Sequence, residues 1–412
     1  MIRAVRGTRD LLPPSTAVWN HVEDVARRVF RAYNYQEIRT PIFEETALFA
    51  RGVGEETDIV SKEMYTFDDH GTMLTLRPEN TASVMRALIE HRLDQQPGVQ
   101  KLYYLGPMFR RERPQKGRYR QFYQIGAEAI GSESPAVDAE VIELVMEILA
   151  QAGIAGTHVL LNSVGCPKCR PVFTERLQAQ LAGVAGDLCE DCQRRAVTNP
   201  LRVLDCKVPA CQPVIERLPS ILDSLCEDCS PHFAAVRQYL EDRGIPYEVR
   251  PRLVRGLDYY RRTTFEVTHG ALGAQNSILG GGRYDGLAES LGARIKAPGI
   301  GFSIGEDRLV LAIEETSPQQ HRHVLDLFLA PMGEAAQRHA GVLARDLRRD
   351  GWTVETGEGK LKRSLDLANK LGARFTLIVG DDEIASGAYS LKNMTTGEQI
   401  AVPRGEIAAH LK

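Results

Sequence analysis

Long apolar runs are absent from this sequence. It contains no stretch of about eighteen apolar residues, the length that a membrane-spanning helix requires. The opening segment, MIRAVRGTRDLLPP, lacks the apolar core of a secretory signal peptide. The net charge is only −3 over 412 residues, so any affinity for nucleic acid must come from local basic patches. These absences predict a cytoplasmic protein with no membrane partner.

Cysteine is absent outside one short region. All eight cysteines lie in residues 166–229, and disulfides are rare in long chains without an export signal. Three Cys-x-x-Cys pairs occur there, at 166–169, 189–192 and 226–229, and each pair can present two thiolates to one tetrahedral ion. Because the first two pairs approach zinc-ribbon spacing, the candidate zinc ligands are Cys166, Cys169, Cys189 and Cys192.

The sequence leaves two questions about these cysteines open. Cys206 and Cys211 also lie in the region, so the pairing of the ligand sets is undetermined. The alternative to a metal site is a set of ordinary reduced cysteines.

The most strongly charged segment lies between two predicted strands, 102–109 and 121–130. It reads RRERPQKGRYR, with six arginines or lysines against one glutamate, and Pro114 and Gly117 mark a turn. A solvated charged turn is the simpler interpretation. However, Arg110, Gln124 and Glu128 are separated by even spacings, which places them on one face of a hairpin without a bulge. Buried polar groups need partners, and a bound polyanion plus a small polar ligand would supply them.

This segment resembles motif 2 of class II aminoacyl-tRNA synthetases, and FRRERPQKGRYRQFYQ is similar to histidyl-tRNA synthetases in particular. A predicted helix over 17–31 followed by a strand containing Pro41 resembles motif 1, the dimer element, and implies a homodimer. Further segments carry the same resemblance, and LVRGLDYY discriminates best among them. These segments are RGTRDLLP (6–13), RPENT (77–81), LVRGLDYY (253–260), LGGGRYDGL (279–287) and PGIGFSIGEDRLVL (298–311), the last resembling motif 3.

The resemblance implies an α+β fold with two domains. Residues 1–320 would form the antiparallel-sheet catalytic domain of a class II synthetase, with the cysteine-rich insertion at about 166–240 within it. In the last ninety or so residues, predicted strands alternate with predicted helices at 334–350 and 361–371, a pattern that indicates a parallel sheet. Residues 321–412 therefore resemble an α/β anticodon-binding domain.

The resemblance also implies a role for individual residues. Those expected to act catalytically, by stabilising phosphate charge, are Arg110, Arg255 and Arg308. Those expected to bind histidine are Glu79 and Thr81 at its α-amino group, with Gln124, Glu128, Tyr259, Tyr260 and Tyr284. Those expected to bind ATP are Arg110, Glu112, Arg118, Phe122 and Arg308. The sequence departs from the family at Asp307, where a glutamate is usual.

The implied reaction is the ATP-dependent joining of L-histidine to tRNA(His), with Mg²⁺ on the phosphates. The substrate carboxylate is already ionised and attacks the α-phosphate, so no protein nucleophile is needed, and cations must stabilise the transition state. The loop Arg111–Arg120 is suited to the tRNA acceptor end, and the C-terminal domain to the anticodon.

Three alternative functions compete with this interpretation of the sequence. The nearest is the non-catalytic regulatory subunit of ATP phosphoribosyltransferase, which resembles this catalytic domain but usually lacks RGLDYY and the C-terminal domain. Another class II synthetase would not carry LVRGLDYY. A zinc-dependent nucleic-acid-binding module would account for the cysteines alone.

Overall fold

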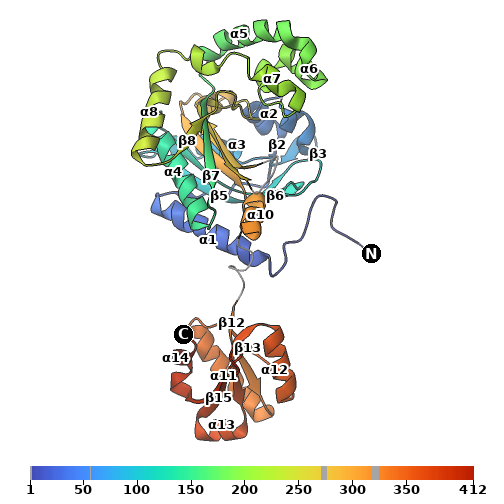
Figure 1. The fold of residues 1–412 in the computed structure, drawn as a ribbon, viewed down its shortest axis with the longest axis vertical. Helices are drawn as coiled ribbons and strands as arrows, with labels where there is room; N and C mark the ends of the chain where they lie inside the picture. Colours follow the sequence, from blue (N-terminus) through green and yellow to red (C-terminus); the bar gives the residue numbers. More distant parts are fainter. Residues whose placement is uncertain (1, 56, 271–275, 317–323) are drawn as a thin grey trace. The chain divides into compact units, whose positions relative to one another are not determined.

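The computed structural model describes residues 2–55, 57–270, 276–316 and 324–412. The chain folds as two compact units, Met1–His321 and Arg322–Lys412, and each is described by itself (Figure 1). The predicted linker 315–323 falls largely outside the described residues.

The first unit is built on an eight-stranded sheet. All neighbouring strands are antiparallel except the two edge pairs, β1–β5 and β7–β8, which are parallel. The strands, in spatial order, are β1 (Gln36–Glu37), β5 (Gln100–Phe109), β6 (Gln121–Ile130), β11 (Gly299–Gly305), β10 (Ser277–Arg283), β9 (Arg261–His269), β7 (Thr157–Ser163) and β8 (Tyr247–Val249).

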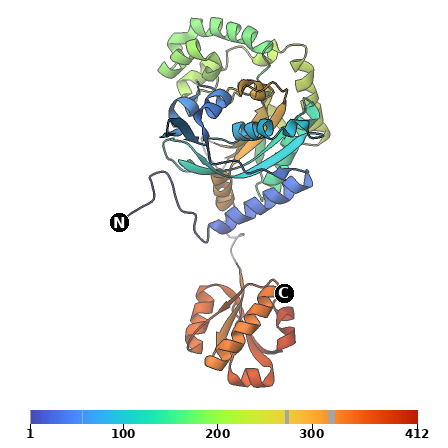
Figure 2. The same cartoon turned by 180° about the vertical axis from the view of Figure 1, so that it is seen from behind.

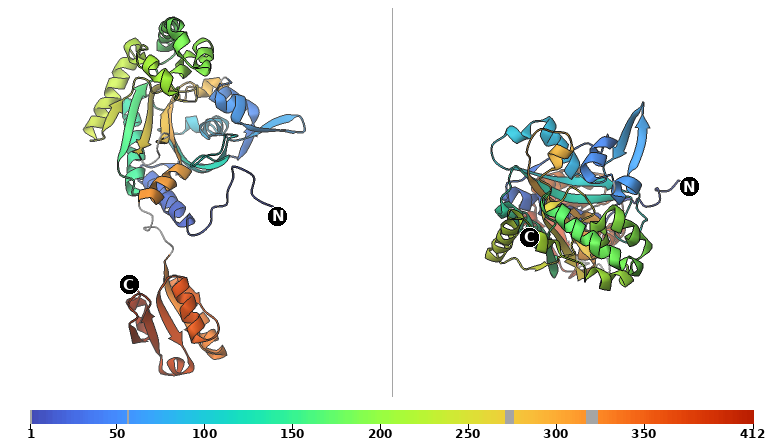
Figure 3. Two further views of the ribbon diagram at one scale, coloured as in Figure 1. Left: turned by 45° about the vertical axis from the view of Figure 1, so that its right-hand side comes forward. Right: turned by 90° about the horizontal axis from the view of Figure 1, so that it is seen from above.

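A smaller antiparallel sheet accompanies the large one. Its order is β2 (Phe43–Glu45), β4 (Thr72–Leu76) and β3 (Tyr65–Asp69). Figure 3 shows the β3–β4 hairpin, drawn in blue, projecting from the body of this unit. A left-handed turn residue, Gly71 at φ +91°, closes this hairpin.

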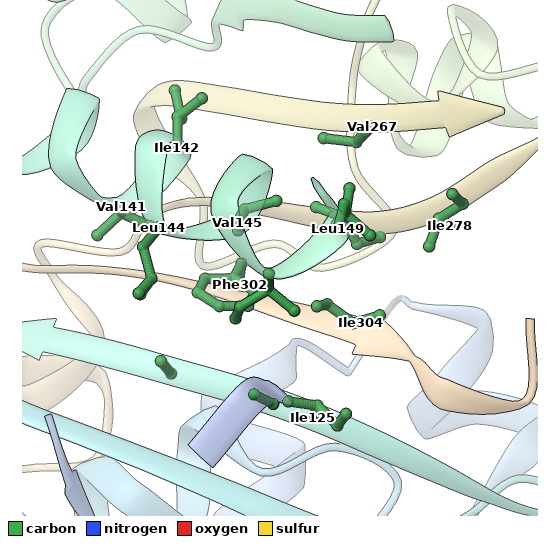
Figure 4. Packing of buried hydrophobic residues seen from close by; sticks show 14 of the residues in the cluster. Ile125, Val141, Ile142, Leu144, Val145, Leu149, Val267, Ile278, Phe302 and Ile304 are labelled. Atoms are coloured by element: carbon green, nitrogen blue, oxygen red, sulfur yellow. The ribbon is translucent and has the colours of Figure 1, made fainter. Parts of the chain in front are cut away.

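One face of the large sheet carries the main apolar core. The helices packed there are α1 (Thr16–Ala32), α4 (Pro135–Gln151), α8 (Cys229–Asp242) and α10 (Glu306–Thr316). Figure 4 shows α4 directing Leu144, Val145 and Leu149 at the sheet, where Phe302 and Ile304 of β11 meet them. The spacing of these apolar residues matches the helical period, which is why α1 and α4 form where the sequence predicts them.

The opposite face of the sheet is covered by shorter helices. They are α2 (Thr46–Val53), α3 (Thr81–Glu90) and α9 (Leu287–Ser290), with a π-helical turn at Ile59–Glu63 and a 3₁₀ turn at Leu93–Gln95. Along β6, Ile125 and Ala127 face the main core, so the alternation of the strand directs Gln124 and Glu128 to this second face. The short helices of this face appear behind the sheet in Figure 1 and nearer the viewer in Figure 2.

The cysteine-rich insertion lies between β7 and β8. Its helices are short apart from the first, and they gather on one side of the unit in Figure 1. They are α5 (Cys169–Val184), η3 (Ala185–Asp187), α6 (Glu190–Thr198), η4 (Pro200–Val203), η5 (Pro209–Cys211), α7 (Gln212–Ile215) and η6 (Ile221–Ser224), after which α8 leads back to the sheet. A small core of its own, including Phe173, Leu177 and Val203, holds the insertion together.

The second unit is an α/β domain. Its five-stranded sheet is parallel in the trio β13–β12–β14 and antiparallel in the hairpin that adds β15 and β16, which agrees with the predicted alternation and final hairpin. The elements are β12 (Leu325–Pro331), α11 (Glu334–Arg349), β13 (Val354–Thr356), α12 (Leu361–Lys370), β14 (Ala373–Val379), α13 (Asp381–Ser386), β15 (Ala388–Asn393), β16 (Gln399–Pro403), η8 (Arg404–Glu406) and α14 (Ile407–His410).

One local expectation was wrong, and one helix start has an unexpected cap. The strand predicted over residues 35–44 is split into β1 and β2, because Pro41 has no N–H and the Arg77 guanidinium takes the Thr40 carbonyl at 3.1 Å. At the start of α3, neither Asn80 nor Thr81 caps the helix. The Glu79 carboxylate does so instead, accepting from the backbone N–H groups of Thr81 (2.7 Å) and Ala82 (3.0 Å).

Glu306, the first residue of α10, places a carboxyl group inside the core. Its side chain is fully buried, and neither carboxyl oxygen has a hydrogen-bond partner among the described residues. Burial, with Glu23 and Asp307 nearby and Arg27 opposing them, raises its pKa well above the ordinary value. Because the folded-state pKa exceeds the unfolded one, this carboxyl makes the fold lose stability as pH rises above about 4.5.

We therefore expect Glu306→Gln to be more stable than the parent protein at pH 8, with the gain shrinking towards pH 4. The gain should be at least about 1 kcal/mol, since one unit of pKa corresponds to about 1.4 kcal/mol. Thermal unfolding from pH 4 to pH 8 measures it, and the exposed Glu289→Gln variant on α9 is the control. A gain that does not depend on pH would contradict this account.

Candidate active site

Arg110, Gln124 and Glu128 lie on the same face of the β5–β6 hairpin. The pairing register is continuous from Gln100↔Ile130 to Phe109↔Gln121. The Arg110 backbone N–H extends it by donating to the Arg120 carbonyl at 2.9 Å. With no residue inserted, the even spacing places these three side chains on the face that α3 and α9 cover.

Glu128 lies at the centre of this face, with 1% of its surface exposed. Its Oε1 accepts from the hydroxyl groups of Thr81 (2.7 Å) and Tyr104 (3.4 Å), and its Oε2 accepts from Tyr284 (2.7 Å). Burial raises the pKa of Glu128 to about 8, although the three hydroxyl groups favour the ionised form. The carboxyl is therefore poised to change its protonation state near neutral pH.

Two polar groups at the start of α3 face Glu128. Thr81, the first residue of the helix, holds Glu128 through its hydroxyl, and Glu79 is 4% exposed with both oxygens on backbone N–H groups. Burial raises the pKa of Glu79, although the hydrogen bonds oppose the shift. A carboxylate offers about four acceptor positions, so Glu79 retains capacity for a ligand.

Three tyrosines form one wall beside Glu128. The Tyr259 and Tyr260 ring centroids are 4.7 Å apart, and Tyr259 lies 5.9 Å from Tyr284 in an edge-on arrangement. All three are less than 9% exposed. Tyr259 and Tyr260 come from residues 250–260, an irregular segment between β8 and β9 rather than a strand.

Gln124 is 8% exposed, and its Oε1 atom has no hydrogen-bond partner among the described residues. A buried amide oxygen without a partner carries a desolvation cost that a ligand donor can remove. This atom lies on the same strand face as Glu128, so it marks a position for a ligand N–H group.

Positively charged side chains gather at the hairpin end of the same face. The Arg110 Nε donates to the Pro78 carbonyl at 2.9 Å, and its guanidinium lies 5.2 Å from the Phe122 ring centroid. Glu112 lies between two arginines, 2.9 Å from Arg118 and 3.9 Å from Arg110. Arg110, Glu112, Arg118 and Phe122 thus form the first part of this group of charged side chains.

Arg255 and Arg308 form the second part of this group of charged side chains. Arg255 pairs with Glu266 of β9, and Arg308 donates to the Ser277 carbonyl at 2.5 Å. Burial lowers the pKa of Arg308, and the positive charge of Arg118 lowers it further. Two guanidinium groups that repel each other in a partly buried site favour an anion between them.

Glycines on β10 and β11 make room for this site. A Cβ atom at Gly280 would lie 1.8 Å from the Arg255 guanidinium, and one at Gly301 would lie 1.7 Å from a Glu128 oxygen. Cβ atoms at Gly126, Gly282 and Gly299 would likewise lie within 3.0 Å of Tyr104, Tyr260 and Tyr284 respectively. The glycine-rich strands therefore let large polar side chains lie flat against the sheet.

Sequence reasoning missed two residues of the site, Tyr104 and Glu266, which hold Glu128 and Arg255. The only signal for either residue in the sequence is its position along its strand, β5 or β9, where alternation directs its side chain to the face of the site. Asp307, where the family usually has glutamate, holds the segment around Arg9 and the β6 backbone. It accepts from Arg9 (2.8 Å) and from the Tyr123 N–H (2.9 Å).

The eight cysteines form two clusters of four, outside the face described above. In each, the four sulfur atoms lie within 4.8 Å of one another and can hold a metal ion. The ribbon-like grouping expected from the sequence is wrong, because Cys166 and Cys169 lie at the start of α5 whereas Cys189 and Cys192 follow its far end, at the start of α6. The clusters are Cys166, Cys169, Cys226 and Cys229, and Cys189, Cys192, Cys206 and Cys211.

Two cavities adjoin the segment that carries the tyrosines. One of about 370 Å³ is bordered by Arg51, Arg170 and Tyr259, and one of about 190 Å³ by Arg202, Arg255 and Tyr260 among others. Neither of these two cavities is bordered by Arg110 or Arg308.

A family model described as histidyl-tRNA synthetase matches residues 7–309 of this chain. The chain belongs to the histidyl-tRNA synthetase family. A second model, described as an anticodon binding domain, matches residues 326–412. The α+β fold class predicted from the sequence is confirmed.

Relatives in the family match along the whole chain. The histidine–tRNA ligase of Solibacter usitatus (strain Ellin6076) is 73% identical over 412 residues, covering 100% of this chain and 99% of the relative. That of Koribacter versatilis (strain Ellin345) is 57% identical, covering 100% and 96%. The crystal structure of apo Staphylococcus aureus histidyl-tRNA synthetase is 40% identical with a TM-score of 0.82, and each chain is fully covered.

The chain is therefore a histidine–tRNA ligase, which activates L-histidine with ATP and transfers it to the 3′ end of tRNA(His). Full-length similarity to these ligases favours this function over that of the regulatory subunit. Across the described residues, no helix is both long enough and apolar enough to cross a membrane.

Proposed function

We propose that the imidazole of L-histidine binds between Glu128 and the tyrosine wall. The buried Glu128 carboxyl, held by three hydroxyl groups, carries this assignment. Glu128 accepts one ring N–H, and Tyr259 or Tyr260 serves the other ring nitrogen, since a phenol both donates and accepts. Tyr284 fixes the Glu128 carboxyl. An apolar analogue would leave these buried groups unpaired, which is the basis of specificity.

The α-ammonium group of histidine binds at the start of α3 in this proposal. Glu79 supplies the opposite charge, Thr81 adjoins it, and the unpartnered Gln124 oxygen accepts an ammonium N–H. The helix end and the strand face thus orient the amino acid, and its carboxylate points towards Arg255.

In the adenylation step, this carboxylate attacks the α-phosphate of ATP, and pyrophosphate leaves. Arg110 and Arg255 stabilise the negative charge that gathers on the α-phosphate, while Arg118 and Arg308 hold the remaining phosphates. Phe122 backs the Arg110 guanidinium and Glu112 orients the two arginines beside it. Mg²⁺ would accompany ATP as a phosphate counter-ion, and Glu112 and Glu266 are the carboxylates beside these arginines.

The remaining assignments concern the wider protein. Residues 1–320 act as the catalytic domain, with the insertion at about 166–240, and residues 321–412 bind the anticodon. The loop Arg111–Arg120 meets the acceptor end of the tRNA. Zinc binds in the insertion, and the protein works in the cytoplasm.

We further propose a homodimer in which the motif 1 region takes part. Phe43 (52% exposed) and Phe67 (45% exposed) present apolar surface on the small sheet. Sedimentation velocity should give twice the chain mass of 45.7 kDa. Charged replacements at both phenylalanines should shift the protein towards monomers, whereas the same change at exposed Val342 of α11 should not. A parent protein that sediments as a monomer would contradict the dimer.

The raised pKa of Glu128 predicts proton release when histidine binds. The ionised carboxylate is the stronger acceptor for the imidazole N–H, so binding near neutral pH should release protons from this group, whose pKa is about 8. Affinity should therefore rise with pH up to about 8. Calorimetry in buffers of different ionisation enthalpy measures the release directly.

Glu128→Gln should abolish this release and weaken histidine binding by about 10-fold or more. The exposed Glu289→Gln variant should behave like the parent protein. Proton release that persists in Glu128→Gln would show that another group ionises, and would overturn the role given to Glu128.

The glycines predict two contrasting variants. Gly280→Ala displaces only the flexible end of Arg255, so the rate of histidine-dependent ATP–pyrophosphate exchange should fall by about 10²-fold with little change in thermal stability. Gly281→Ala would place its Cβ 2.5 Å from both the Gly301 carbonyl and the Phe265 ring, so it should mainly destabilise the fold. Exchange and thermal unfolding separate the two. Equal activity of Gly280→Ala and the parent protein would remove Arg255 from the mechanism.

A further inference from the structure

Both cysteine clusters have the geometry of a single tetrahedral ion. Four thiolates at about 2.3 Å from zinc have sulfur atoms about 3.8 Å apart along each tetrahedral edge. In the first cluster, Cys166 lies 3.8 Å from Cys169 and 3.7 Å from Cys226, sulfur to sulfur. In the second, Cys189 lies 3.9 Å from Cys206. All eight thiols are free, and the spacing fits one shared ion in each cluster.

Backbone N–H groups point at these sulfur atoms. In the first cluster, the N–H of Lys168 donates to Cys166 Sγ (3.3 Å) and that of Cys226 to Cys169 Sγ (3.1 Å). The second cluster has a matching pair, from the N–H of Cys189 to Cys211 Sγ (3.3 Å) and from Val208 to Cys206 Sγ (3.4 Å). Such donors stabilise thiolates and orient them on a metal.

Each cluster is linked to the segment that carries the histidine pocket. Arg170 follows Cys169 directly, and its guanidinium donates to the Tyr260 carbonyl at 2.6 Å and to the Val164 carbonyl at 3.1 Å. Arg202 lies between Cys192 and Cys206, and donates to the Arg255 carbonyl at 3.4 Å and to Asp58 at 3.2 Å. These two arginines therefore reach the two ends of residues 255–260.

The elements around the second cluster are short, although the insertion has a small apolar core of its own. Between Cys189 and Cys211 its elements are α6 and short 3₁₀ turns, and both Arg170 and Arg202 border the cavity of about 190 Å³ under residues 254–260. A metal that closes the chain at four cysteines adds a further constraint to this core, because metal-binding free energy becomes folding free energy.

We propose that the insertion binds two zinc ions, one in each four-cysteine cluster, and that the two centres hold residues 255–260 in place through the positioning residues Arg170 and Arg202. This proposal rests on the proposed zinc binding. It adds the number of ions, the four cysteines that bind each ion and the structural role of the two centres. The first centre fixes the Tyr260 end and the second fixes the Arg255 end.

The first experiment counts metal ions in the purified full-length protein, without reference to activity. Elemental analysis for zinc and iron should give two zinc ions per chain. Cys226→Ser and Cys206→Ser should each retain one, because each removes a ligand of a different cluster. Cobalt in place of zinc should show the absorption of tetrahedral thiolate coordination. Folded parent protein with no zinc, with iron instead, or with one ion per chain that is absent from both variants would overturn the two-centre assignment.

The second experiment tests the positioning residues with matched controls. Arg202→Ala should keep both zinc ions and lower kcat/KM for histidine in ATP–pyrophosphate exchange by about 10-fold, the usual cost of a lost supporting contact. Arg194→Ala, on the neighbouring helix and paired with the exposed Asp191 at 2.6 Å, should match the parent protein. Arg170→Ala should raise KM for histidine, with Arg176→Ala of α5 as its control.

Combining the variants separates the metal from the arginine. If the second centre acts through Arg202, Cys206→Ser combined with Arg202→Ala should lose no more activity than Cys206→Ser alone. Additive losses would overturn the link while leaving zinc binding intact. If Cys206→Ser does not fold, Arg202→Ala with two zinc ions still decides, since activity equal to that of Arg194→Ala contradicts the proposal. Parent protein with two zinc ions but no histidine-dependent exchange would contradict the proposed site instead.

Discussion

The candidate active site depends on glycines, which have no Cβ atom, at the centre of a β-sheet. Glu128 lies over Gly301 and Arg255 lies over Gly280, at distances that no side chain at the glycines would allow. Long polar side chains can thus lie flat on the strands and still keep their partners. A larger residue at either glycine would therefore displace a named neighbour, Arg255 or Glu128.

Burial gives this face its chemistry. Glu128 and Glu79 are carboxyl groups withdrawn from water, and burial raises the pKa of both. At the other end, four arginines from three different segments are held by carbonyl groups, Glu112 and Glu266. Acceptors at one end and cations at the other match an amino acid that points its carboxylate at a phosphate. In the proposed reaction, these arginines supply the charges that stabilise the transition state.

The insertion shows how a part of the chain outside the sheet can act on it. Residues 250–260 have no regular structure, although they supply Arg255, Tyr259 and Tyr260. The Tyr260 and Arg255 carbonyl groups are instead held by Arg170 and Arg202, whose backbones belong to the cysteine-rich insertion. The irregular segment and the cysteine clusters are therefore parts of one supporting arrangement.

The sequence by itself determined much of this protein. Periodicity located α1, α4, β5 and β6, even spacing put Gln124 and Glu128 on one face, and LVRGLDYY indicated the family. These features are local, because each is carried by residues that lie close together in the sequence. Only the tertiary structure decided that Cys226 joins Cys166, that Tyr104 and Glu266 complete the site, and that Arg77 interrupts the strand around Pro41. Those contacts join residues distant in the chain, and their partners depend on how the elements pack, which no spacing along the sequence records.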